Sequence, residues 1–412
     1  MNRGTRILVL AVSSVVVLYA GIGYALARSS DDNTYRSLGV YSEVLQRVQQ
    51  DYVEEPNIRQ VTRGALHGLV ESLDPQSGYL SAREYEDYQA RVKTPERGSI
   101  GVALSKRFGY LMVLEALPDS PAQKAGLSTG DILETIAGFS TREISIRQAE
   151  LLLAGDPGTT VKISAVRHGG TESHQVEITR AVIPAPRLVT DKLEDDTAYL
   201  RVPAFTAGRA AEIRQKLVEF SRQGMHKLVL DVRDCASGSF TEAIATANLF
   251  LNTGTIATLR GQTVPVKTFA ADAQKMVWPG PVTVLISAST AGPAEVLAAA
   301  LADDRAAPTI GEGTFGSAGE QNIIPLEDGG ALILTTALYH APSGKSINEA
   351  GVKPSVEMAR SYDEPSDVEG GAEGEGAQHP AAGASSRAHD DPAVRKALEI
   401  LHSQPAVPAK AA

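Results

Sequence analysis

The chain has 412 residues, enough for two or three domains, and its 43% hydrophobic and 21% charged residues are ordinary for a soluble globular protein. A net charge of −10 argues against nucleic acid as a partner. The single cysteine, Cys235, excludes an internal disulfide, and no cluster of His, Cys and Asp has the spacing of metal ligands. We therefore expect neither a metal nor another cofactor.

The N-terminus carries an uncharged apolar run, residues 7–27, behind Arg3 and Arg6. About 20 such residues span a bilayer. Positive charges on the short N-terminal side predict that this side stays in the cytoplasm and that the rest is exported. The run ends in Ala-Leu-Ala, which also suits signal cleavage. We favour an uncleaved anchor over residues 1–28, which places the globular part in the periplasm or another extracytoplasmic space of the cell envelope; cleavage is the alternative.

The rest of the chain divides by pattern into five parts. Residues 34–96 have helical periodicity, and residues 97–184 read as short strands with one helix, typical of a small, partly open barrel. Residues 185–360 alternate strands and helices, which predicts an α/β core with a parallel or mixed sheet and a site at the carboxyl ends of its strands. Residues 361–389 are rich in Gly, Ala and Glu and predict a flexible linker, and residues 390–404 predict a terminal helix.

Several motifs occur together in a fixed order. They are "LDPQSGYLSAREYEDYQ", "GSIGVAL", "DSPAQKAGLSTGDILETIAG", "GDPGTTVKISAVR", "LVLDVRD", "TIGEGTFGSAGEQ" and "APSGKSINEAGVKPSVEM". In this order they resemble the C-terminal processing, or tail-specific, serine peptidases of bacteria, over about Tyr35 to Met358. The resemblance implies an N-terminal helical segment, a protease core and an inserted PDZ domain.

The resemblance assigns a peptide-binding role to "GSIGVAL". In a PDZ domain, the backbone N–H groups of such a loop, here Ser99, Ile100, Gly101 and Val102, face the C-terminal carboxylate of a peptide that adds to the sheet edge as a strand. Glycine lets the backbone approach the ligand closely. The alternative is a hairpin turn with no ligand.

The catalytic positions depart from the family pattern. In this family a serine three residues before a glutamate attacks the peptide, and a lysine after Thr-Phe-Gly is the general base. The glutamate is Glu295 here, so the nucleophile position is Gly292; the base position is Ser317, and Gln321 occupies the position of a supporting glutamine. Glycine has no side chain to attack with, and a serine hydroxyl is far too weak a base to replace a neutral amine.

The loop after the strand "LVLDV" departs as well. The family normally has Asn-Pro-Gly-Gly there and uses a backbone N–H of the loop in an oxyanion hole. In "DVRDCASGSF", Ala236 and Ser237 precede Gly238, so only one glycine of the pair remains. Two side chains nearby are candidates for a relocated nucleophile, Ser289 in the turn before Gly292 and Cys235 in this loop; Lys345 is a lysine that could approach in space.

The sequence thus favours an exported, membrane-anchored pseudopeptidase that binds C-terminal tails of envelope proteins through its PDZ domain. An active paralogue or a second copy of the chain is a further expected partner. Two alternatives stay open. One is a working endopeptidase with a relocated serine or cysteine nucleophile, and the other is a structural module whose PDZ groove is closed.

Overall fold

A computed structural model describes residues 36–93, 98–107, 109–194, 196–359 and 388–403. The chain separates into two compact units, 1–66 and 67–412. The predicted anchor over residues 1–28 and nearly all of the predicted linker lie outside the described residues. Within the described ranges, no helix is both long and apolar enough to cross a bilayer. The domain boundaries that the sequence suggests stay predictions.

Helices open the described chain. Residues 36–51 are helical, and α2 (Ile58–Glu71) follows after the break that Pro56 predicts. α2 is amphipathic and buries His67 and Val70. The His67 ring lies edge-on to Tyr79, with ring centroids 5.4 Å apart.

The central sheet has six strands in the order β17-β14-β13-β10-β9-β8. All neighbouring pairs are parallel except β8 with β9. Its strands are β8 (Val189–Lys192), β9 (Thr197–Arg201), β10 (Lys227–Asp231), β13 (Val282–Ile286), β14 (Thr309–Gly311) and β17 (Val356–Glu357). β13 is buried along its whole length, as expected for a parallel strand that is covered on both faces.

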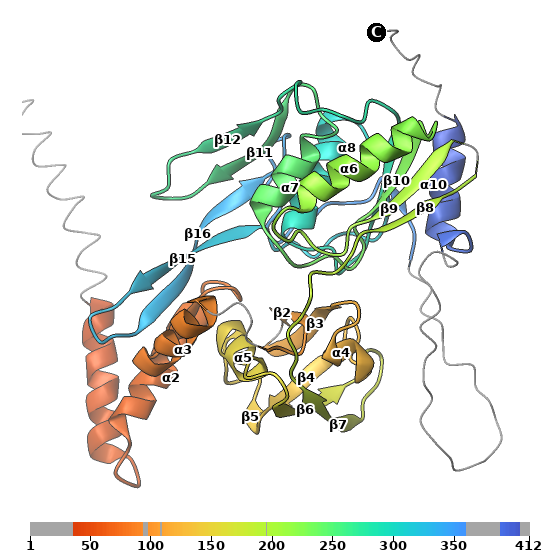
Figure 1. The fold of residues 1–412 in the computed structure, drawn as a ribbon. Helices are drawn as coiled ribbons and strands as arrows, with labels where there is room; N and C mark the ends of the chain where they lie inside the picture. The colour runs from red at the N-terminus through yellow and green to blue at the C-terminus, as the bar shows by residue number, and fades with distance from the viewer. Residues whose placement is uncertain (1–35, 94–97, 108, 195, 360–387, 404–412) are drawn as a thin grey trace, which may run out of the picture. The chain divides into compact units, whose positions relative to one another are not determined.

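Helices cover both faces of this sheet (Figure 1). Leu228 and Leu230 of β10 point into a hydrophobic cluster with three helices, whereas Val229 points to the opposite face and packs with the C-terminal helix. The three helices are α6 (Arg209–Arg222), α7 (Phe240–Ala247) and α8 (Pro293–Asp304); the C-terminal helix is α10 (Pro392–Ser403). Asp391 caps α10 as its sequence predicts, because its Oδ1 atom accepts the Ala393 N–H at 2.8 Å.

A second sheet is entirely antiparallel, and the sequence analysis did not separate it from the first. Its long strand β16 pairs with β1, β11 and β15, and β12 pairs with β11. The strands are β1 (Gly78–Leu80), β11 (Thr255–Arg260), β12 (Lys267–Ala270), β15 (Gly319–Pro325) and β16 (Ala331–His340), and α3 (Ala82–Lys93) follows β1.

Six further strands form a β-rich unit with its own hydrophobic cluster. They are β2 (Val102–Arg107), β3 (Tyr110–Ala116), β4 (Ile132–Ile136), β5 (Phe139–Ser140), β6 (Thr160–Val166) and β7 (Ser173–Thr179). The sheet order β2-β3-β4-β6-β7 leaves β2 at one end. The predicted helix is α5 (Ile146–Leu153), capped by Ser145 and Gln148, and a short helix that the sequence analysis missed is α4 (Pro121–Lys124).

Candidate functional site

The turn between β13 and α8 holds the nucleophile position. Gly292 is the N-cap of α8 and has φ +58° and ψ −117°, a conformation that L side chains rarely adopt. A Cβ atom built there would lie 3.4 Å from the Ser317 carbonyl oxygen and 3.9 Å from the Phe240 ring. The position therefore faces the base position, and there is space for a side chain where none exists.

Glu295 connects Gly292 and Ser317, the positions that the resemblance assigns to the nucleophile and the base. Its carboxylate is fully buried and accepts four hydrogen bonds. The donors are the N–H groups of Gly292 (2.8 Å), Gly316 (2.6 Å) and Ser317 (2.8 Å) and the hydroxyl of Thr314 (2.5 Å). Burial raises the pKa of Glu295, and these four hydrogen bonds oppose the rise. One carboxylate thus holds the end of α8 against the loop that carries Ser317.

The Ser317 side chain contacts a residue that the sequence analysis did not single out. Gln76 Nε2 donates to Ser317 Oγ at 3.3 Å. The backbone N–H of Gln76 donates to Asp74 Oδ1 at 2.8 Å, which ties this stretch of backbone to Asp74. Gln76 lies in the "LDPQSG" motif, but the motif alone does not connect it to Ser317.

Gln321 occupies the position that the resemblance assigns to a supporting glutamine, but its hydrogen bonds go to Gly319 and Thr335 and not to Ser317. Its Nε2 atom donates to the Gly319 carbonyl at 3.1 Å and to Thr335 Oγ1 at 3.4 Å. Within this arrangement Gln321 supports the β15–β16 pair, and the amide that reaches Ser317 is that of Gln76.

The loop after β10 keeps one glycine for a steric reason. A Cβ atom at Gly238, where φ is +121°, would lie 2.4 Å from the Phe205 carbonyl oxygen. The neighbouring Phe205 N–H donates to the Ser237 carbonyl, and the Ser239 N–H donates to the Phe205 carbonyl. The loop is therefore tightly paired with the segment around Phe205, and only glycine fits at 238.

Cys235 lies inside the core in this loop. Its side chain is fully buried in the cluster with α6, α7 and α8. Burial raises the pKa of the thiol well above its ordinary value, and the nearby Glu115 carboxyl group raises it further. A buried thiol that resists ionisation is a poor nucleophile at neutral pH.

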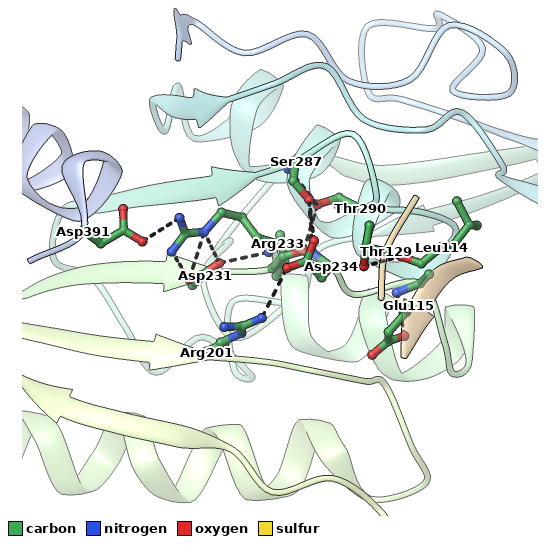
Figure 2. Close-up of polar contacts among 12 residues, drawn as sticks. Leu114, Glu115, Thr129, Arg201, Asp231, Arg233, Asp234, Ser287, Thr290 and Asp391 are labelled. Carbon is green, nitrogen blue, oxygen red and sulfur yellow. Dashed lines mark hydrogen bonds and ion pairs between the residues drawn. The ribbon is translucent and has the colours of Figure 1, made fainter. Parts of the chain in front are cut away.

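Ser289 is also buried, with 7% of its surface exposed. The hydroxyl groups on either side of it are structural. Thr290 Oγ1 donates to the Val232 carbonyl at 2.9 Å and accepts the Ser287 N–H at 3.0 Å. Ser287 Oγ accepts the Asp234 N–H at 3.1 Å, so this turn is tied to the loop after β10 (Figure 2).

A charged network lies beside the site (Figure 2). Asp231 at the end of β10 is fully buried, and its carboxylate accepts hydrogen bonds from Arg233 and from the Tyr199 hydroxyl. Burial alone would raise the pKa of Asp231, but Arg233, Arg201 and the Tyr199 hydroxyl outweigh it and lower the pKa to about 2. Arg233 Nη1 also binds Asp391 at 2.8 Å, which joins the sheet to α10.

The loop expected to bind a carboxylate, Ser99 to Val102, leads directly into β2 of the β-rich unit. Gly101 has φ +79°, and a Cβ atom there would lie 2.5 Å from that of Ser120. The Ile100 carbonyl accepts the Ala122 N–H at 2.9 Å, and the Gly101 carbonyl accepts the Leu117 N–H at 2.9 Å. Both carbonyls are thereby directed into the unit, at the point where β2 begins at Val102.

Among the described residues, no group of three or more His, Cys, Asp or Glu side chains is arranged to hold a metal ion.

Comparison with known proteins agrees with this fold. The model of peptidase family S41 matches residues 196–358. The carboxy-terminal-processing protease of Bartonella bacilliformis is 32% identical over 337 residues, which cover 81% of this chain and 77% of that protein. The carboxy-terminal processing protease CtpA of Bacillus subtilis is 26% identical, over 84% of this chain and 74% of that protein.

A solved structure shows the same fold. The photosystem II D1 C-terminal processing protease superimposes with a TM-score of 0.66 at 23% identity, over 78% of this chain and 92% of that chain. This likeness shows that the two chains share a mixed α/β fold. The chain belongs to the S41 family of C-terminal processing peptidases.

Proposed function

We propose that this chain is an exported, membrane-anchored S41 member that binds C-terminal peptide tails and does not hydrolyse them. The observation that carries the proposal is the pair Gly292 and Ser317. The turn at α8 and the Thr-Phe-Gly loop are held together by Glu295, yet the first offers no attacking atom and the second no amine. Serine-type hydrolysis needs both groups.

No neighbouring group on these loops replaces the base. The side chain that reaches Ser317 Oγ is the amide of Gln76, which donates a hydrogen bond and has no useful basicity. Lys345 is exposed, whereas a lysine that serves as general base must be buried enough to become neutral. The buried thiol of Cys235 is equally unsuited to attack.

The β-rich unit supports the tail-binding part of the proposal, and we assign it as a PDZ domain. β2 is the end strand of its sheet, so an extended peptide can pair with its other edge. The loop over Ser99 to Val102 lies at the start of β2, where the carboxylate of such a peptide would arrive. The Gly101 N–H donates to the Ser99 hydroxyl at 3.3 Å, a long hydrogen bond that a charged carboxylate would replace with a stronger one.

The proposed location and partners follow from the N-terminal part. The apolar run over residues 7–27 would anchor the chain in the inner membrane, and envelope proteins would supply the tails. Residues 36–51 expose apolar side chains, with Leu38 58% and Val44 56% exposed. Such side chains support association with a second copy or an active paralogue.

A peptide titration tests tail binding. The full chain is titrated with a short labelled peptide that ends in apolar residues, with a free or an amidated C-terminus. We expect amidation to weaken binding about tenfold or more, because a charged hydrogen-bond acceptor is lost. Gly101→Ala should weaken binding similarly, since its Cβ would collide with Ser120.

Gly109→Ala is the matched control. Gly109 has φ +81°, close to that of Gly101, but a Cβ atom there meets nothing within 4 Å. The affinity of the Gly109→Ala variant for the free peptide should equal that of the wild type. Equal affinity for the free and amidated peptides, or no binding of either, would refute tail capture and favour a structural module with a closed groove.

A further inference from the structure

Glu115 reaches from the β-rich unit to the loop after β10. It lies on β3 and is only 2% exposed. Its Oε2 atom accepts the Ala236 N–H at 3.2 Å and the Ser237 hydroxyl at 3.0 Å. The loop that borders the candidate site is thus hydrogen-bonded to Glu115 of the β-rich sheet, which Figure 2 labels.

Both donors exist because this chain departs from the Asn-Pro-Gly-Gly pattern. Ala236 stands where that pattern has proline, which has no N–H group. Ser237 stands where the pattern has glycine, which has no hydroxyl. The two substitutions that alter the oxyanion loop are therefore the two that supply the hydrogen bonds to Glu115.

A second contact also joins the β-rich sheet to the core. The Arg107 guanidinium, at the end of β2, lies 5.0 Å from the centre of the Phe315 ring. Phe315 is two residues from Ser317. The β2–β3 pair of the β-rich unit thus touches both loops that carried catalysis in the family pattern.

We infer that Glu115, Ala236 and Ser237 form a clasp that fastens the β-rich unit to the S41 core and that opens when the Glu115 carboxyl group loses its proton. The inference is independent of tail capture, because the contact needs no ligand. A clasp of this kind fixes the position of the β2 edge relative to the core, and its opening frees the β-rich unit to move.

The charge on Glu115 decides the state of the clasp. Burial raises the pKa of Glu115 to about 8, and the two hydrogen bonds oppose the rise. Among the groups that face it, Asp234 disfavours the carboxylate, Arg201 favours it, and the Cys235 thiol is buried nearby. In the open state, exposure to water returns the pKa towards about 4.5. Between pH values of about 4.5 and about 8, the Glu115 carboxyl group is protonated in the clasped state and ionised in the open state. Opening therefore releases a proton, and raising the pH favours the open state.

Distances between spin labels test the clasp in the full chain. Lys162 on β6 and Gln215 on α6 are exposed and are replaced by labelled cysteines, while Cys235 is buried and stays unlabelled. We expect a narrow distance distribution at about pH 6 and a broad one at about pH 9.5, with the open-to-clasped ratio rising about tenfold or more. Combining Ala236→Pro with Ser237→Gly should broaden the distribution at both pH values.

Glu115→Gln separates the charge from the contact. Glutamine is nearly isosteric and can accept the Ala236 N–H, so the distribution should stay narrow at both pH values. Glu177→Gln, an exposed carboxylate on β7 of the same sheet, should behave as the wild type. A wild-type distribution that is the same at both pH values, or that Ala236→Pro with Ser237→Gly leaves narrow, would overturn the clasp. A pH response that persists in Glu115→Gln would overturn Glu115 as its trigger.

Discussion

The Oε2 atom of Glu295 lies 2.8 Å from the backbone nitrogen of Ser317. The same oxygen accepts the Gly292 N–H, so one buried carboxylate holds Gly292 and Ser317 in place together. The framework of the site is therefore maintained by a residue that takes no part in proton transfer. The framework is connected although neither position carries the side chain that the family pattern has there.

Replacing Glu295 by alanine should destabilise the fold strongly. The substitution leaves buried N–H and hydroxyl donors without an acceptor, and each unsatisfied donor costs about 1–3 kcal/mol. We expect the free energy of unfolding to fall by about 3 kcal/mol or more, measured by denaturant titration. Glu327→Ala, at an exposed position, should change it by less than about 0.5 kcal/mol. A similar small change for Glu295→Ala would show that the carboxylate does not hold the site together.

Restoring the two catalytic side chains should recover little activity. Gly292→Ser has space for its Cβ but keeps a positive φ, so we expect it to cost about 1–3 kcal/mol of stability. Gly292→Ser with Ser317→Lys should hydrolyse an unfolded substrate only slowly, because the oxyanion loop is also altered. Adding Ala236→Pro and Ser237→Gly should raise the rate about a hundredfold, the usual effect of one oxyanion donor. If the double variant is already as fast as the quadruple one, this loop does not limit the chemistry.

Cys235 should resist alkylation in the folded protein. Its thiol is fully buried and its pKa is raised, so reaction with iodoacetamide at neutral pH requires the chain to open. We expect alkylation of the folded protein to be at least about a hundredfold slower than alkylation of the protein unfolded in urea. Intact-mass spectrometry measures both rates. Equal alkylation rates in the folded and unfolded protein would show that Cys235 is reactive in the folded protein.

The docking of α10 should depend on Asp391. This residue caps the helix through the Ala393 N–H and pairs with Arg233 at 2.8 Å. Asp391→Ala should cost about 1–2 kcal/mol from the lost cap and ion pair, and should speed hydrogen exchange of the α10 amides. Asp390→Ala, the exposed neighbour, is the control and should leave exchange unchanged. Equal exchange in both variants would show that the apolar face of α10 is sufficient for docking.

Two strands at the centre of the sheet were predictable because burial makes them nearly continuous apolar runs. β10 and β13 both show this pattern. The antiparallel sheet was not separated from them, because β15 is mostly exposed and gives no clear alternation of apolar and polar residues. α4 was missed because four residues are too short for a helical period.

The residues of the candidate site were also only partly predictable from the sequence. The resemblance to the family's motifs pointed to Gly292, Ser317 and Glu295, since the turn and the loop are local features of the chain. Gln76 and Glu115 were not predicted as neighbours of the site, because Gln76 is 241 residues from Ser317 and Glu115 is 121 residues from Ala236. Only the fold brings such residues together, because the motifs in which they lie do not by themselves connect them.

The most direct test of the central claim is intact-mass spectrometry of the full chain incubated with an unfolded substrate that ends in apolar residues. We predict that the substrate mass stays unchanged and that no acyl adduct forms on the protein. Cleavage products that disappear in Ser289→Ala or Cys235→Ala, or an acyl adduct on any side chain of the core, would contradict the account.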